Sequence, residues 1–135
     1  MSEAQTVSLS VSVVVFKTPI DYVLMTLESA IASITYAREQ ELLSGVVLQI
    51  IDNSVDFEYT SEIQSVIDHL QLPDFCTVTL EQNKRNNGFG AAHNQAIIDT
   101  NSDIHLVLNP DVELSRSALY RGISTLINDT SLLLV

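Results

Sequence analysis

The feature of this sequence that most constrains its fold is a regular alternation between short apolar runs and longer stretches of helical periodicity. Residues 7–16 are rich in β-branched valine and end in an unbroken apolar run, which is typical of a strand buried on both faces. After Pro19, apolar residues recur at helical spacing up to about residue 41. The two patterns then repeat, which predicts strands at residues 46–51, 77–81 and 104–108 and helices at 63–70, 90–99 and 115–127.

This order of strands and helices specifies the kind of sheet. Each connection between consecutive strands contains a helix and is too long for a hairpin, so the strands are expected to run parallel. We therefore expect an α/β fold, a Rossmann-like three-layer α/β/α arrangement with a mostly parallel sheet. The 135 residues, 46% of them hydrophobic, suit one such domain over residues 1–135. An apolar run at residues 132–135 predicts a further strand, and with it a chain that is the N-terminal part of a longer protein.

Composition excludes several classes of function. The net charge is −11, which disfavours nucleic acid as a partner. Cys76 is the single cysteine, so an intramolecular disulfide and a cysteine-rich zinc site are excluded. The start of the sequence lacks the basic and apolar segments of a signal peptide, and no apolar run approaches the roughly 20 residues that span a bilayer. A cytoplasmic location is expected.

In open parallel sheets, ligands bind beyond the carboxyl ends of the strands. Lys17, Lys84 and Arg85, three of the six basic residues of this acidic chain, are expected at that edge, and Arg116 is not far beyond it in sequence. This placement predicts an anionic ligand. The polar residues that follow the four expected strands are Lys17 and Thr18, then Asp52, Asn53 and Ser54, then residues 82–87, and finally Asn109 and Asp111.

Residues 86–94 contain two glycines, Gly88 and Gly90, just before an expected helix. Glycines allow a tight turn with exposed N–H groups, and the N-terminus of the helix that follows attracts phosphate. His93 replaces the third glycine of the dinucleotide-binding fingerprint, and the motif does not follow the first strand, so a hydride-transfer enzyme is disfavoured. The alternative is that Asn87-Gly88 only forms a turn and Gly90 only allows close packing.

The three histidines are interpreted without a catalytic role. His93 is expected on an exposed or ligand-facing side of its helix, and His69 at the surface. His105 lies within an expected strand and is interpreted as structural.

Two strands are expected to end in a carboxylate. Asp111 follows the strand at residues 104–108 and could hold a hard divalent cation, although a single carboxylate at such a position is more often a turn or capping residue. Asp52 and Asn53 could contact a ribose or a base, or could simply end their strand.

Taken in order, these motifs resemble the N-terminal half of the family 2 glycosyltransferases, which have a GT-A fold. Residues 12–16 resemble the family's opening strand, 47–54 its strand ending in Asp-Asn-x-Ser, and 83–94 its asparagine- and glycine-containing block. The family's metal-binding Asp-x-Asp motif reads Asn109-Pro110-Asp111 here, the variant that resembles rhamnosyltransferase-like members. Only Asp111 is carried over as a ligand of Mg²⁺ or Mn²⁺. The family's turn after the first strand is not matched, because residues 16–19 read Phe-Lys-Thr-Pro.

The resemblance implies an inverting transfer of a sugar, which is rhamnose in the rhamnosyltransferase-like members, from a nucleoside-diphosphate sugar in cell-surface polysaccharide synthesis. Deoxythymidine-diphosphate-rhamnose (dTDP-rhamnose) or a UDP-sugar is the implied donor, and a saccharide or a lipid-linked precursor the acceptor, with peripheral membrane association of the full-length protein. The family's general base lies beyond the equivalent of Val135, so no catalytic residue is expected in this chain. A non-catalytic nucleotide-sugar-binding or assembly module of the same fold and an unrelated α/β nucleotide-binding domain are the alternatives. The expected donor-binding residues are Lys17, Thr18, Asp52, Asn53, Asn83, Lys84, Arg85, Asn87, Gly88, Gly90, Asn94, Asn109 and Asp111.

Overall fold

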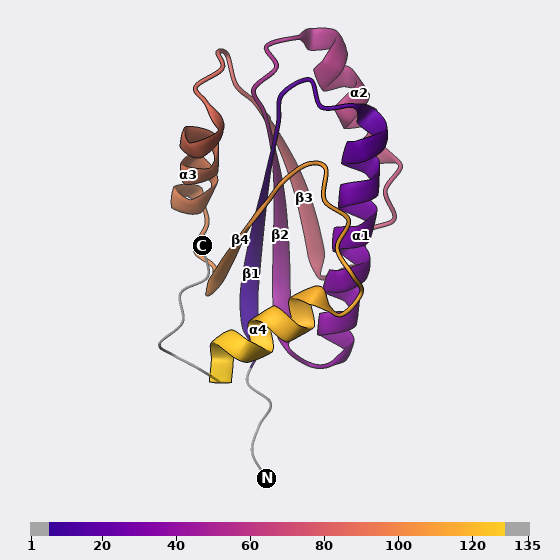
Figure 1. The fold of residues 1–135 in the computed structure, drawn as a ribbon, viewed down its shortest axis with the longest axis vertical. Helices are drawn as coiled ribbons and strands as arrows, with labels where there is room; N and C mark the ends of the chain where they lie inside the picture. The colour runs from indigo at the N-terminus through magenta and orange to yellow at the C-terminus, as the bar shows by residue number, and fades with distance from the viewer. Residues whose placement is uncertain (1–5, 129–135) are drawn as a thin grey trace.

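Strands and helices alternate strictly in the computed structural model, which describes residues 6–128 (Figure 1). The expected α/β class is therefore confirmed, and the strand expected at 132–135 lies outside the described residues. Within the described part of the chain, no helix is long and apolar enough to cross a membrane. The elements are β1 (Val7–Val15), α1 (Ile20–Glu39), β2 (Leu43–Asp52), α2 (Phe57–Asp68), β3 (Cys76–Gln82), α3 (Phe89–Asp99), β4 (Ile104–Leu108) and α4 (Ala118–Asn128).

The four strands form one parallel sheet in the order β3-β2-β1-β4. Val15 at the end of β1 pairs with Asp52, and Asp52 pairs in turn with Gln82, so the ends of β1, β2 and β3 are level. The loops that leave these three strands gather at the top of Figure 1. Because β2 and β3 lie on one side of β1 and β4 on the other, the direction of strand addition reverses beside β1, the position where open α/β sheets bind ligands.

The two faces of β1 differ in polarity. Its odd-numbered residues, from Val7 to Val15, pack into the main core with α1 and α4, where Leu27 and Ile34 are fully buried. Burial of each of these two side chains contributes about 1.5–3 kcal/mol. The opposite face meets α3 through a small apolar cluster of Val14, Ile51, Ala92 and Ala96. Helices therefore cover both faces of the sheet, as the expected three-layer arrangement requires.

Helix α2 begins at Phe57, earlier than the expected residue 63. Its first turn has no buried apolar residue, and Phe57 is 78% exposed, so hydrophobic periodicity does not reveal it. Asp56 specifies this start, because its Oδ1 accepts hydrogen bonds from the N–H groups of Glu58 and Tyr59.

A chain of polar side chains joins α3 to β1 and β4. Ser12 Oγ lies 2.6 Å from His93 Nδ1 and 2.8 Å from His105 Nε2. Ser10 Oγ lies 2.6 Å from His105 Nδ1. The prediction that His93 is exposed or faces a ligand is therefore wrong. It is 4% exposed, because Ser12 provides a polar partner on the sheet face against which α3 packs.

The other two histidines lie as expected. His105 hydrogen-bonds inside the fold, which supports its structural interpretation, and His69 is exposed at the end of α2. Burial lowers the pKa of His93, and the neighbouring His105 lowers it further. Burial also lowers the pKa of His105. The fold therefore favours the neutral form of both imidazoles over the charged form.

This network predicts a pH dependence of stability. Both histidines have an ordinary pKa of 6.5 that folding lowers, so the unfolded chain binds protons first as the pH falls. The stabilisation is fully present above pH 6.5 and is lost as the pH falls toward the folded-state pKa values. Between about pH 7.5 and 5.5, the wild type should lose about 1 kcal/mol more unfolding free energy than His93→Gln/His105→Gln, measured by urea denaturation. Equal losses would contradict the prediction, and His69, present in both proteins, cancels in the comparison.

Candidate functional site

The candidate site is the edge of the sheet formed by the loops that follow the four strands, here called the rim. Hydrogen bonds show that three of these loops are in contact. The backbone N–H of Lys17, after β1, donates to Ser54 Oγ, after β2, over 2.7 Å. Asn53 Nδ2, after β2, donates to the carbonyl oxygen of Gly88, after β3, over 3.2 Å. The structure therefore brings these segments together as the sequence predicts.

The loop after β1 is held in a special backbone conformation. Lys17 has a φ of 50°, in the left-handed region, and its side chain is exposed. The carbonyl oxygen of Thr18 accepts a 2.6 Å hydrogen bond from the hydroxyl of Tyr59 on α2. Burial raises the pKa of Tyr59 to about 12, so the hydroxyl stays a neutral donor. Tyr59 thus fixes this loop, a role that the sequence pattern does not reveal.

Asp52 is completely buried and its carboxylate is used inside the protein. Its Oδ1 accepts a 2.8 Å hydrogen bond from the N–H of Ser54, and its Oδ2 accepts a 2.6 Å bond from Thr60 Oγ1. These contacts close the loop between β2 and α2. The Asp-x-Ser spacing is typical of a side-chain turn of this kind, whereas nothing local identifies Thr60. The predicted contact of Asp52 with a base or ribose stays a prediction.

The loop after β3 leads into the uncapped N-terminus of α3. Gly88 precedes the helix with a φ of 88°, a conformation that other residues rarely adopt, and no side chain caps the helix. Gly90 lies in the exposed first turn, and a Cβ added there would meet no atom within 4 Å. Packing therefore does not require a glycine at this position. The first N–H groups of α3 are left accessible at the rim.

Two basic residues lie in the loop that leads to this helix terminus. Lys84 and Arg85 are both exposed in the loop between β3 and α3. Within residues 6–128, neither side chain forms an ion pair. Two free cations near the positive end of a helix dipole favour an anionic ligand such as a phosphate.

The remaining asparagines of the predicted set are less tightly connected. Asn83 is half-buried, and its Nδ2 donates to Asn53 Oδ1 over 2.5 Å. Asn87 is exposed, with its Oδ1 3.5 Å from Asn83 Nδ2. Asn94 is exposed on α3. None of these positions excludes contact with a ligand, and their predicted roles stay predictions.

Asn109 and Asp111 lie exposed in the loop after β4, on the other side of β1. Leu108, the last residue of β4, pairs with Val13, so this loop leaves the sheet near the end of β1. The described residues contain no group of three or more histidine, cysteine or acidic side chains able to hold a metal ion by themselves. One carboxylate and one amide oxygen are hard donors that fit a divalent cation whose other ligands are phosphate oxygens and water.

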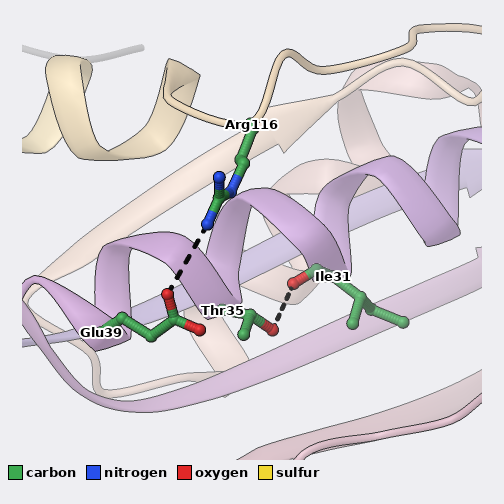
Figure 2. Close-up of polar contacts among 4 residues, drawn as sticks. All are labelled: Ile31, Thr35, Glu39 and Arg116. Carbon is green, nitrogen blue, oxygen red and sulfur yellow. Dashed lines mark hydrogen bonds and ion pairs between the residues drawn. The ribbon is translucent and has the colours of Figure 1, made fainter.

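Arg116, which follows the rim loop of β4 in the sequence, lies away from the rim beside the last turn of α1. Its guanidinium stands 3.8 Å from the carboxylate of Glu39, in the last turn of α1 (Figure 2). It also lies over the Tyr36 ring, 4.8 Å from the ring centroid. The same view shows Thr35 donating to the carbonyl oxygen of Ile31, one helical turn back. Helix α1 runs away from the rim, so its last turn lies at the opposite edge of the sheet. The loop from β4 to α4 carries Arg116 there.

Two large hollows lie away from the rim. One of 730 Å³ lies between α1 and α2, and one of 510 Å³ opens near the beginning of β1, β2 and β3. Residues of the predicted donor site line neither hollow. The rim therefore offers hydrogen-bond donors and positive charge on an open surface, outside both hollows.

No protein-family model and no curated protein sequence matches this chain. Among the solved structures similar to it is the mannosyltransferase PcManGT from Pyrobaculum calidifontis, in complex with GDP-Man and Mn²⁺, with a TM-score of 0.72 and 17% sequence identity. The match covers 90% of this chain and 33% of that one, so this chain spans about a third of the length of the similar structure. Over nearly all of its length, the chain has the α/β fold found in this glycosyltransferase.

Proposed function

We propose that this chain is the nucleotide-sugar-binding part of a GT-A glycosyltransferase similar to the rhamnosyltransferase-like members of family 2. The observation that carries the proposal is the position of the uncapped N-terminus of α3 at the ligand-binding edge of the sheet, with Lys84 and Arg85 exposed in the loop that leads to it. The similarity in fold to a mannosyltransferase in complex with GDP-Man and Mn²⁺ supports it.

In this proposal the rim binds the diphosphate of the donor. Negative charge on the diphosphate grows as the bond to the sugar breaks, so groups aimed at it stabilise the transition state more than the ground state. The free N–H groups of α3 and the cations of Lys84 and Arg85 are such groups. A bound divalent cation would neutralise phosphate oxygens, and Asp111, with Asn109 beside it, would hold that cation.

The proposed reaction is inverting displacement by an acceptor hydroxyl. Its general base is proposed to belong to a part of the protein outside this chain. The proposed donor is a nucleoside-diphosphate sugar, with dTDP-rhamnose or a UDP-sugar as candidates, and the acceptor a saccharide or lipid-linked precursor of a cell-surface polysaccharide. A cytoplasmic protein associated with the inner face of the membrane fits these substrates.

The first test removes the two cations. Lys84→Ala/Arg85→Ala should weaken binding of the tightest-binding nucleoside diphosphate among UDP, GDP and dTDP about tenfold or more, and binding of its nucleoside less than about twofold. Calorimetry at two salt concentrations checks this, and the loss should shrink at high salt. The thermal midpoint should barely change, because both side chains are exposed. Arg121→Ala, an exposed cation on α4, is the control. Equal losses for diphosphate and nucleoside would exclude a phosphate site here.

The second test adds a methyl group where packing leaves room for one. In a helix the Cβ points toward the N-terminus, so Gly90→Ala should hinder a phosphate approaching the first turn of α3. Gly122 in α4 is the matched control, because a Cβ there also meets no atom within 4 Å. Both changes should leave stability equal or raise it by up to about 1 kcal/mol. Only Gly90→Ala should weaken diphosphate binding, by about fivefold or more. Unchanged affinity in Gly90→Ala would mean that no phosphate approaches this turn.

The third test concerns the metal. Asp111→Asn should weaken diphosphate binding about tenfold in Mg²⁺ or Mn²⁺ and hardly at all in a chelator, because the carboxylate acts through the cation. Glu113→Gln removes the same charge from an exposed neighbour and should have little effect in either condition. If Asp111→Asn has the same effect with and without metal, Asp111 is not a metal ligand.

A further inference from the structure

Asn53 is a buried residue whose hydrogen bonds join several segments of the rim. It is only 1% exposed, and its backbone N–H donates to the carbonyl oxygen of Val15 over 2.9 Å. Its side-chain Nδ2 donates to the carbonyl oxygen of Gly88, and its Oδ1 accepts from Asn83 Nδ2. Through its backbone and its side chain, this one residue therefore connects the ends of β1 and β2 with the turn that precedes α3.

The carbonyl oxygen of Gly88 is a critical atom of that turn. It also accepts the 3.2 Å hydrogen bond from the N–H of Ala92 that begins the helical bonding of α3. On its other side, the N–H of Gly88 donates to Asn86 Oδ1 over 2.9 Å. The two peptide groups that flank Gly88 are thus both hydrogen-bonded, and the second of them, between Gly88 and Phe89, sets the direction in which the free N–H groups of the first turn point.

Asn83 supports the orientation of the Asn53 amide. The oxygen and nitrogen of an amide exchange places when it rotates by half a turn, and only one arrangement presents a donor to the carbonyl oxygen of Gly88, which can only accept. That arrangement leaves the Oδ1 of Asn53 on the other side, where Asn83 Nδ2 donates to it and so favours the same orientation. The backbone N–H of Asn83 is itself fixed, since it donates to the carbonyl oxygen of Asp52 over 2.9 Å.

We propose that Asn53, oriented by Asn83, is a positioning residue that fixes the N-terminus of α3 at the rim and acts on the bound diphosphate through Gly88, without contacting it. The binding of a diphosphate at the rim rests on the proposed function, whereas the restraint of the helix terminus by Asn53 does not depend on it.

Amide hydrogen exchange tests the restraint in the absence of any ligand. In Asn53→Ala, the N–H of Ala92 should exchange about tenfold faster or more, while the amides of Val13 and Leu48 in the sheet core keep their protection. Asn101→Ala, at an exposed position beyond the other end of α3, is the control and should change none of these rates. An unchanged exchange rate at Ala92, or an equal increase at all three amides, would overturn the proposal, because Asn53 would then have no specific effect on the start of α3.

Calorimetry with the same nucleoside diphosphate and nucleoside tests the consequence for binding. Asn53→Ala should weaken diphosphate binding about tenfold and nucleoside binding less than about twofold. Faster exchange at Ala92 with full diphosphate affinity would overturn the positioning role. If the wild type binds no diphosphate, the proposed function fails, and the exchange data still decide whether Asn53 restrains the helix.

Asn83→Ala provides a second variant if Asn53→Ala does not fold. It leaves the donor of Asn53 in place and removes only the group that orients it. Exchange at Ala92 should then increase by about threefold or more, again without change at Val13 and Leu48. Wild-type exchange at Ala92 in Asn83→Ala would overturn the orienting role of this residue.

Discussion

The parallel pairing of β1 with strands on both of its sides is the interaction on which the rest of this structure depends. Level pairing brings the ends of β1, β2 and β3 to one edge, and β4 adds a fourth loop beside β1. Parallel strands leave the sheet in the same direction, so loops that are far apart in sequence meet there. Hydrogen bonds then join the turns at this edge. Ser54 Oγ accepts from the N–H of Lys17, and Asn53 Nδ2 donates to the carbonyl oxygen of Gly88. The rim is thus a consequence of strand direction, and its polar residues fix its shape.

The position of α3 is set by two different kinds of contact. A small apolar cluster holds its middle against β1 and β2, whereas Ser12 and the buried His93 form a polar contact beside it. At its start, Asn53 binds the carbonyl oxygen of Gly88, and Asn86 accepts from the N–H of Gly88. A helix fixed at these points can keep its first N–H groups in one direction without a capping side chain. The unbonded N–H groups of an uncapped helix terminus cost stability when no ligand is bound. An anion bound at the terminus would accept hydrogen bonds from them and remove that cost.

Local sequence patterns predicted the fold class and most of the elements, including β4, whose bounds agree with residues 104–108 because polar turn residues flank it. They missed the first turn of α2, since Asp56 specifies it by a side-chain hydrogen bond and not by an apolar stripe. They also misplaced His93, whose partner Ser12 is 81 residues away in sequence. The rim residues were predicted from the ends of strands, but which of them face a ligand depends on contacts between loops. Asp52 and Asn53 are accordingly buried and bonded within the protein, which a strand-end rule cannot anticipate.

The most direct test of the account is a map of amide chemical-shift changes when the labelled protein is titrated with UDP, GDP and dTDP in the presence of Mg²⁺. The account predicts that at least one of these nucleotides shifts the amides of Gly88, Gly90 and Asp111 together, because they surround one site at the carboxyl ends of the strands. The hollow between α1 and α2, lined by residues such as Leu24 and His69, should stay unaffected. Changes confined to that hollow, or no changes with any of the three nucleotides, would contradict it.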